Sequence, residues 1–348
     1  MSELRDHDSA LPAQLVARAL SGSRRAIAQV VSLVENDGRA AQEVMSSLYP
    51  RTGRAQVIGI TGSPGTGKST LVSAMAKAYR GRGFTVGVVA VDPTSPFSGG
   101  AILGDRIRMR DLSGDPGVFI RSMATRGALG GLAATTSDVV RVLDAVGYQV
   151  ILIETVGVGQ AEVDVVRVAH TVLVVEAPGL GDDIQTLKAG IIEIADIFVV
   201  NKADLPGTDA VVSALRAAIS LGRGALTYAG HHQLELPARS NLADSGVPDD
   251  SWQIPVHEVA ALDHVGIDAL VETIDAHAAY LHRSGRWQQR EKERIESDLT
   301  SRLRQLVIQR LMAQLKAGEW EALLESIVVR DLDPQTAAAR LMERLMNA

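Results

Sequence analysis

The segment from Gly62 to Ser69 carries the residue types and the spacing of a phosphate-binding loop. It fits the pattern GxxxxGKS and stands between a short apolar run and a segment with helical periodicity. Glycines in such a loop let backbone N–H groups turn toward a β-phosphate, while Lys68 reaches the β- and γ-phosphate oxygens and the Ser69 hydroxyl can ligate Mg²⁺. We expect the nucleotide to be bound by Gly62, Ser63, Pro64, Gly65, Thr66, Gly67, Lys68, Ser69 and Thr70.

A second motif, Asn201-Lys202-Ala203-Asp204, fits NKxD and follows another apolar run. The Asp204 carboxylate can accept hydrogen bonds from N1–H and the N2 amino group of guanine, whereas adenine has no N1–H to donate. A helix-capping aspartate is the alternative interpretation. Because the motif follows a late strand of a phosphate-loop domain, we expect Asn201, Lys202 and Asp204 to bind guanine, and GTP to be preferred over ATP.

Two further carboxylates, Asp92 and Glu154, end expected strands. Phosphate-loop enzymes hold Mg²⁺ with carboxylates at such positions, and Gly157 offers a backbone N–H to the γ-phosphate. Asp105 lies in the glycine-rich segment after Asp92, which suits a switch that becomes ordered on nucleotide binding. The residues that we predict to be catalytic are Lys68, Asp92, Asp105 and Glu154, and those that we predict to hold the metal are Ser69, Asp92, Asp105 and Glu154.

The elements that must position these residues are strands and helices in alternation. Short β-branched runs lie at 57–61, 85–91, 118–121, 150–154, 171–176, 197–200 and 256–259, with helical segments between them. This alternation predicts an α/β fold: a P-loop NTPase with a mostly parallel central sheet covered by helices. Ligands bind at the carboxyl ends of such strands, which is where the motifs above stand.

Helical segments extend the chain at both ends. After Gly285, a highly charged helical pattern carries one apolar stripe, formed by Ile295, Leu299, Leu303, Leu306, Val307, Leu311 and Leu315. The stripe predicts a partner helix, most simply from another subunit, and the alternative is packing on its own domain. We predict a helical N-terminal extension at 1–54, a P-loop GTPase domain at 55–282 and a C-terminal helical dimerisation arm at 283–348.

Composition excludes several classes of protein. The 348 residues are 46% hydrophobic, 22% charged and only 3% aromatic, with a net charge of −6, which argues against a nucleic-acid partner. No apolar run approaches the roughly 20 residues of a membrane span, and the start is too polar for a secretory signal, so we expect no membrane association and a cytoplasmic location. The absence of cysteine excludes disulfides and thiolate metal sites.

Three strings point to a family: PTSP at 93–96, GGAILGDR at 99–106 and ETVGVGQ at 154–160, of which the first two together are more specific than the phosphate loop. With them the chain resembles the methylmalonyl-CoA mutase-associated family, SIMIBI-class GTPases that chaperone adenosylcobalamin-dependent acyl-CoA mutases. The resemblance spans nearly the whole chain. It implies a homodimer that binds the mutase and couples GTP hydrolysis to loading, protection and reactivation of its cofactor. It also implies Mg²⁺ with GTP or GDP, cobalamin that is not bound by this chain itself, and a switch at 179–188 that communicates with the mutase.

The chain departs from the pattern of this family in the segment that supports the base. The usual Ser-Ala-Leu is replaced by Ala260-Ala261-Leu262, so a hydroxyl is missing while the backbone N–H groups remain, and we expect GTP binding to survive. In addition, Val158 stands where many regulatory GTPases carry a water-orienting glutamine, so we expect slow hydrolysis without a partner. The stretch at 222–253 is longer than in typical members, and we assign it no role.

Three other functions compete with this interpretation. A kinase of an amino-acid transport system would need a phosphorylated acceptor, and a guanine-selecting motif suits ATP poorly. A nickel-inserting GTPase would need metal ligands, for which only His231-His232 stands out. A nucleotide-stabilised scaffold without catalysis would also fit slow turnover, so stimulation of turnover by a partner distinguishes it from the chaperone.

Overall fold

The computed structural model describes residues 3–36, 38–93, 109–125, 131–155, 167–179, 193–225, 251–316 and 318–346. The chain forms two compact units, Met1–Arg294 and Ile295–Ala348. None of the helices in these described ranges combines the length and the apolar character needed to cross a bilayer.

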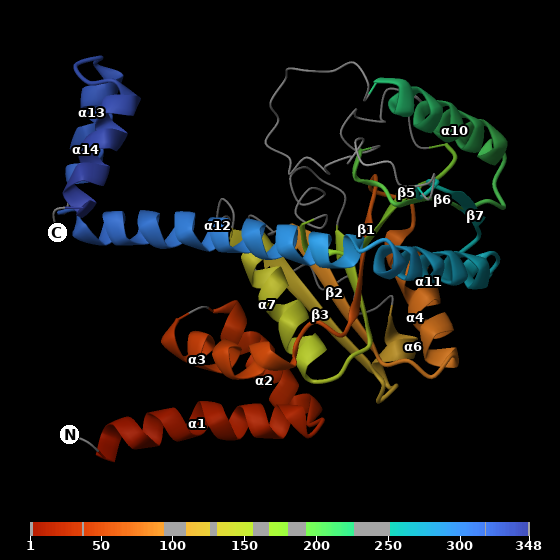
Figure 1. Cartoon of the computed structure of the whole chain (residues 1–348), viewed down its shortest axis with the longest axis horizontal. Coiled ribbons are helices and arrows are strands. Elements are labelled where there is room, and N and C mark those ends of the chain that lie inside the picture. Colours follow the sequence, from red (N-terminus) through yellow and green to blue (C-terminus); the bar gives the residue numbers. More distant parts are fainter. Residues whose placement is uncertain are drawn as a thin grey trace. The chain divides into compact units, whose positions relative to one another are not determined.

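A parallel sheet forms the centre of the first unit (Figure 1). Within the described residues its strands are β1 (Gln56–Thr61), β2 (Val86–Pro93), β3 (Val118–Thr125), β4 (Val150–Thr155), β5 (Thr171–Glu176), β6 (Ile197–Asn201) and β7 (Val256–Val259). Their order is β3-β2-β4-β1-β5-β6-β7, and every neighbouring pair is parallel. The expected mostly parallel α/β sheet is therefore confirmed.

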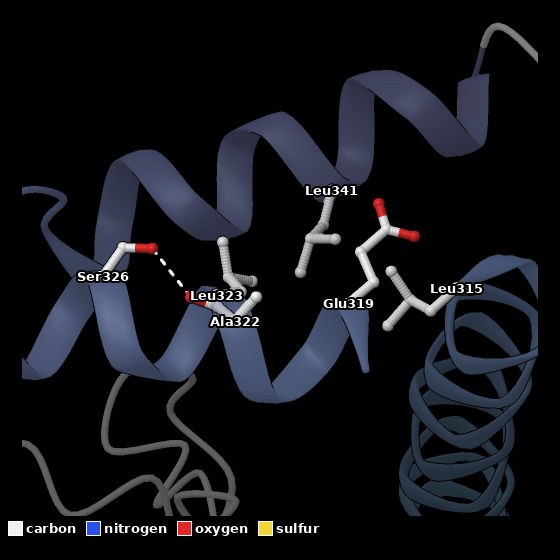
Figure 2. Close-up of a pocket in the computed structure, with 6 residues that line it drawn as sticks. All are labelled: Leu315, Glu319, Ala322, Leu323, Ser326 and Leu341. Atoms are coloured by element: carbon white, nitrogen blue, oxygen red, sulfur yellow. Dashed lines mark hydrogen bonds between the residues drawn. The ribbon is translucent and has the colours of Figure 1, made fainter. Parts of the chain in front are cut away.

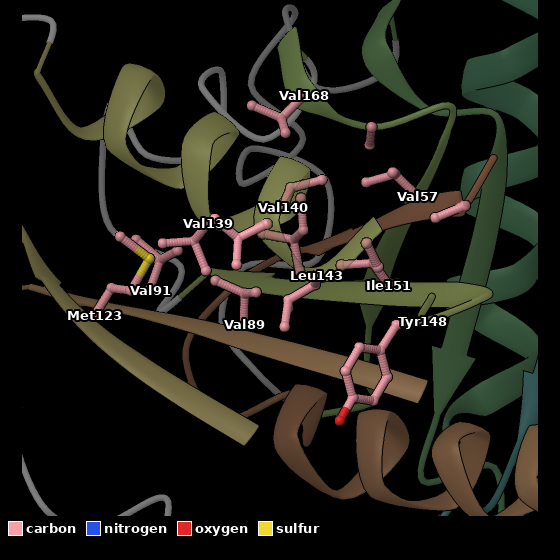
Figure 3. Packing of buried hydrophobic residues seen from close by; sticks show 14 of the residues in the cluster. Val57, Val89, Val91, Met123, Val139, Val140, Leu143, Tyr148, Ile151 and Val168 are labelled. Carbon is pink, nitrogen blue, oxygen red and sulfur yellow. The ribbon is translucent and has the colours of Figure 1, made fainter. Parts of the chain in front are cut away.

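The strands are apolar on both faces because helices cover both faces. Successive residues of β1 point in opposite directions, so that Val57 belongs to one buried cluster and Ile58 to the other. One cluster lies against α4 (Lys68–Gly81) and α11 (Ile267–Arg283). The other lies against α7 (Gly131–Ala145) and α10 (Thr208–Ala225), and Figure 3 shows part of it. A short helix, α6 (Arg110–Ser113), precedes β3.

The N-terminal helices share the core of the first unit. These helices are α1 (Glu3–Leu20), α2 (Arg24–Glu35) and α3 (Arg39–Leu48), followed by the 3₁₀ turn η1 (Tyr49–Arg51). The Ser23 hydroxyl accepts a hydrogen bond from the N–H of Ala26, so it caps α2. Apolar residues of α2, among them Ile27 and Val31, lie in the same buried cluster as Val139 of α7.

The second unit is helical and leaves most of its apolar side chains exposed. It contains the part of α12 (Arg286–Gln314) after Arg294, together with α13 (Glu319–Val328) and α14 (Pro334–Met346). Asp333 Oδ1 accepts a hydrogen bond from the N–H of Thr336 and so caps the last helix. Figure 2 shows a cavity of about 250 Å³ in this unit, lined by Leu315, Glu319, Ala322, Leu323, Ser326 and Leu341.

Candidate functional site

The predicted nucleotide-binding residues meet at the carboxyl edge of the sheet. The phosphate loop joins the end of β1 to the start of α4, and Asn201 is the last residue of β6. Glu154 lies near the end of β4, in register with Ile60 of β1 and Ala90 of β2. The structure thus brings Glu154 next to the phosphate loop, although more than eighty residues separate them in the sequence.

Two glycines of the loop are required by close contacts with the backbone or with a fixed side chain. Gly62 has φ +137°, and a Cβ built on it would lie 2.0 Å from the carbonyl oxygen of Val175 in β5. Gly67 has φ +88°, and its Cβ would lie 2.5 Å from Nδ2 of Asn201. Any side chain at either position would need both a left-handed backbone and displacement of its neighbour. The loop is therefore packed tightly against the ends of β5 and β6.

Lys68 places a buried positive charge inside this loop. Its Nζ donates hydrogen bonds to the carbonyl oxygens of Gly62 at 2.7 Å and Ser63 at 2.9 Å, and the residue is 6% exposed. α4 begins at Lys68, and the first N–H groups of a helix have no partner within it. The ammonium group and the positive end of the helix dipole therefore lie together, which is the arrangement that binds phosphate.

The oxygens beside Lys68 suit a hard cation. Ser69 Oγ donates a hydrogen bond to Glu154 Oε1 at 2.5 Å, and both side chains are buried. A hydroxyl and a carboxylate at a strand end are ligands that Mg²⁺ accepts beside a nucleotide. Asp92, the penultimate residue of β2, also lies at the carboxyl edge of the sheet, because the residue before it, Val91, pairs with Thr155 of β4. The Ser69 hydroxyl and the Glu154 carboxylate fit a magnesium ion bound beside phosphates.

Asn201 joins the phosphate loop to the segment expected to support the base. Its Nδ2 donates to the carbonyl oxygen of Thr66 at 2.8 Å, and its Oδ1 accepts from the N–H of Ala261 at 3.1 Å. Asn201 and Thr66 are both buried. One side chain therefore links the phosphate loop to the segment where base binding is expected. The NKxD pattern identified Asn201, but its contacts across the site could not be found from the sequence.

The end of the site where base binding is expected is more exposed than the phosphate loop. Asp204 is exposed, Lys202 has φ +58°, and Leu262 is 81% exposed. The N–H of Ala260 donates to Val265, and that of Ala261 donates to Asn201. The two alanine N–H groups thus hold the loop itself in shape, which limits what they can offer to a base.

Other predicted site residues lie outside the described ranges. They are Asp105, Gly157 and the part of the expected switch from 180 to 188, as well as the strings at 99–106 and 156–160. Gly179 lies in a turn after β5 with φ +77°. The backbone of Asp92 is described, but its side chain is not.

Two threonine hydroxyls outside the predicted site residues form a pair next to the phosphate loop. Thr155 Oγ1 donates to Thr61 Oγ1 at 3.1 Å, and both residues are buried. They are the last residues of β4 and β1, the two strands that carry Glu154 and the phosphate loop. In the sequence, these residues are marked by their positions, each at the end of a largely apolar run.

Comparison with known proteins identifies the family. A family described as Methylmalonyl Co-A mutase-associated GTPase MeaB matches residues 27–318. A protein of Pyrococcus abyssi named as a GTPase is 46% identical over 334 residues, covering 96% of this chain and 97% of that protein. GTPase ArgK of Escherichia coli is 32% identical over 341 residues, covering 95% of this chain and 96% of that protein.

A solved structure described as an LAO/AO transport system kinase has the same fold. It has a TM-score of 0.67 and 25% sequence identity, and the match covers 97% of this chain and 98% of that one. The phosphate loop and the parallel sheet are those of a P-loop GTPase, as the sequence predicted. The chain belongs to the methylmalonyl-CoA mutase-associated GTPase family MeaB.

Proposed function

We propose that the chain hydrolyses GTP to GDP and phosphate and acts as a chaperone of an adenosylcobalamin-dependent acyl-CoA mutase. The observation that carries the nucleotide part is the contact of Ser69 with Glu154 beside the buried Lys68, with Asn201 joining this loop to the base-binding segment. The mutase part rests on the description of the family. The cobalamin belongs to the mutase in this proposal and is not bound by this chain itself.

The residues of the site divide three tasks among them in the proposed reaction. Lys68 neutralises the β- and γ-phosphate oxygens, and the N–H groups at the start of α4 orient them. Ser69, Asp92, Asp105 and Glu154 hold Mg²⁺, which when bound offsets the negative charge that develops on the phosphates. At the other end of the site, Asp204 accepts hydrogen bonds from guanine.

Turnover depends on a partner in this proposal. Val158 provides no side chain that could orient the attacking water, so the mutase supplies or completes that geometry. The GTP state then gates cofactor loading, and hydrolysis releases the chaperone. The switch expected at 179–188 is the segment that we propose to contact the mutase.

The test is GTP turnover by the purified chain alone and with each adenosylcobalamin-dependent mutase of its source organism, with ATP as the control nucleotide. We expect one mutase to stimulate turnover of GTP but not of ATP, and Lys68→Ala to abolish the stimulated reaction. An absence of stimulation by every mutase would favour the scaffold. Phosphate transferred from ATP to an acceptor protein would favour the kinase, which is the description given to the similar solved structure.

We further propose that the second unit joins two copies of this chain into a homodimer. The part of α12 in this unit exposes four residues of the apolar stripe, Ile295, Leu299, Leu303 and Leu306, and no residue of α12 or α13 is fully buried. A unit of this size buries a small share of its surface by itself and is only marginally stable. A second copy of the same stripe would supply that core, as isologous interfaces do.

Analytical ultracentrifugation tests the dimer. We expect Leu303→Glu with Leu306→Glu to shift the chain from dimer to monomer, because two charges would be buried in the interface. Gln309→Glu adds a charge to an exposed position of the same helix and is the control that should leave the dimer intact. A wild-type chain that sediments as a monomer at all concentrations would refute the proposal.

A further inference from the structure

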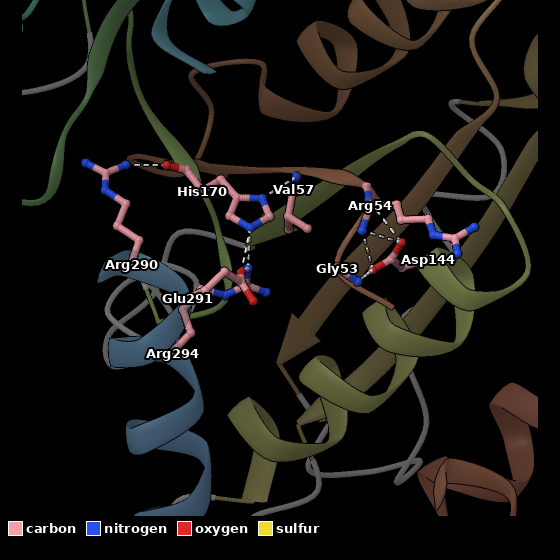
Figure 4. Close-up of polar contacts among 9 residues, drawn as sticks. Gly53, Arg54, Val57, Asp144, His170, Arg290, Glu291 and Arg294 are labelled. Atoms are coloured by element: carbon pink, nitrogen blue, oxygen red, sulfur yellow. Dashed lines mark hydrogen bonds and ion pairs between the residues drawn. The ribbon is translucent and has the colours of Figure 1, made fainter. Parts of the chain in front are cut away.

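A polar cluster, buried at His170 and Asp196 and half-buried on α12, joins the first turns of α12 to the starts of β1 and β5 (Figure 4). The "strand-start cluster" consists of His170, Asp196, Arg290, Glu291 and Arg294, all within the first unit. His170 Nε2 lies 2.8 Å from Glu291 Oε1, and Glu291 also pairs with Arg294. Arg290 donates to both carboxylate oxygens of Asp196, at 2.8 and 3.2 Å, and to the carbonyl oxygen of His170.

The hydrogen bonds of His170 determine its protonation. Its Nδ1 accepts from the N–H of Val57 at 3.0 Å, so the proton of the neutral ring is on Nε2, which faces Glu291 Oε1 and also lies 2.5 Å from Nη1 of Arg294. Burial, with the positive charge of Arg294 nearby, lowers the pKa of His170 to about 4. Burial opposes the charge on Glu291, but His170 and Arg294 outweigh it and lower the pKa of this carboxyl to about 2. At neutral pH the cluster therefore holds a neutral histidine and a charged glutamate–arginine pair.

This cluster sets the position of β1 relative to β5. The N–H of His170 donates to the carbonyl oxygen of Val57 at 2.8 Å, in addition to the ring contact with the Val57 N–H, and the register of the two strands begins one residue later. On the other side, Asp144 of α7 accepts hydrogen bonds from the N–H groups of Gly53 and Ala55, just before β1. The start of β1 is thus held by side chains from two directions.

The phosphate loop follows the other end of β1 and lies against the other end of β5. Five residues of extended chain, about 17 Å, lead from Val57 to Gly62. There the loop lies so close to Val175 of β5 that a Cβ on Gly62 would be 2.0 Å from its carbonyl oxygen. A shift of β1 along β5 would consequently change the contact at Gly62, whose carbonyl oxygen accepts a hydrogen bond from Lys68.

We propose that the strand-start cluster positions the phosphate loop through β1 and β5, so that displacement of the first turns of α12 changes nucleotide binding at the opposite edge of the sheet. The residues of the cluster are positioning residues, since none of them lies at the nucleotide site. The proposal rests on the proposed nucleotide site and gives the C-terminal helices a route by which a bound partner or second subunit regulates it.

Glu291→Gln is the first test, because it removes the charge that pairs with Arg294 and keeps the shape of the side chain. The matched control is Glu35→Gln, which breaks a similarly enclosed pair with Arg121 on the edge strand β3, away from β1 and β5. We expect Glu291→Gln to raise the Kd for GDP at least about fivefold at a temperature where both variants are fully folded. Glu35→Gln should leave it unchanged. Arg290→Lys keeps the charge but loses the paired contacts with Asp196. It is the second test variant, to be used if Glu291→Gln does not fold.

Coupling must act in both directions, so nucleotide binding should in turn affect the cluster. Trp287 reports on the cluster, because its ring stacks on that of His170 with centroids 3.9 Å apart. In the full chain with Trp252→Phe and Trp320→Phe, Trp287 is the only tryptophan. We expect GDP with Mg²⁺ to change its fluorescence, and Glu291→Gln to reduce that change.

Two outcomes would overturn the coupling. One is an unchanged Kd in Glu291→Gln and Arg290→Lys together with a Trp287 signal that does not respond to GDP. The other is an equal rise of Kd in Glu291→Gln and Glu35→Gln, which would indicate general loosening of the unit. Both outcomes leave wild-type GDP binding and mutase stimulation intact, whereas failure of the proposed function would show as a loss of these.

Discussion

The protonation of His170 gives the sharpest quantitative prediction. We consider His170→Asn, in which Asn Oδ1 can take the place of Nδ1 and accept from Val57. In the folded chain, burial lowers the pKa of His170 to about 4, from an ordinary value of 6.5. The unfolded state therefore binds more protons than the folded state between these values. The free energy of unfolding is fully retained above about pH 6.5 and falls as the pH decreases toward 4.

The size of the effect follows from the difference between the two pKa values. At about pH 5, His170 has lost about 2 kcal/mol of its contribution relative to about pH 7.5, which corresponds to about a 30-fold change in the ratio of folded to unfolded chain. Titration of Glu291 contributes little between these two pH values. The pKa of that carboxyl is lowered to about 2, so its contribution to stability is lost at lower pH.

Urea unfolding monitored by tryptophan fluorescence at these two pH values measures the effect. We expect the wild-type chain to lose about 2 kcal/mol more than His170→Asn between them. The comparison is independent of any constant destabilisation by the substitution, and His257, whose pKa burial also lowers, is present in both proteins. Equal losses in the two proteins would show that His170 is not held neutral by the cluster, and would refute the electrostatic description.

Three substitutions test the site itself. Gly62→Ala places a Cβ against the backbone of Val175, and should cost at least about 3 kcal/mol in urea unfolding and abolish GDP binding. Ser69→Ala removes the hydroxyl beside Glu154, and calorimetry should show that Mg²⁺ no longer strengthens GDP binding, with a loss of about tenfold or more. Asn201→Ala leaves two buried backbone groups without a partner, at about 1–3 kcal/mol each, and should raise the Kd for GDP at least about tenfold. Near wild-type GDP binding in any of the three would contradict the geometry assigned to that residue.

The strands could be predicted closely from the sequence because buried parallel strands are continuous β-branched runs. The expected run at 171–176 coincides with β5, and that at 256–259 with β7. β3 was expected at 118–121 but continues to Thr125. The extension carries Ser122, Met123 and Ala124, which have no β-branched pattern, and pairing with β2 keeps them extended.

The site could be predicted only where a local motif encodes it. The spacing of glycines identified the phosphate loop, and NKxD identified Asn201. The strand-start cluster left no such signal, because His170 and Glu291 are 121 residues apart and become partners only when α12 meets the sheet. Periodicity predicts which face of a helix is buried, but it does not indicate which polar groups will meet across the sheet.

The most direct test of a guanine-nucleotide site in this chain is the binding of GDP and xanthosine diphosphate to Asp204→Asn, measured by calorimetry beside the wild type. Xanthine carries N1–H and a carbonyl at C2, so the asparagine amide can accept from the first and donate to the second, while it faces the N2 amino group of guanine with a donor. The account predicts that the variant loses GDP affinity and gains xanthosine diphosphate affinity, by about 100-fold each. An unchanged preference for GDP in the variant would contradict the assignment of Asp204 to the base.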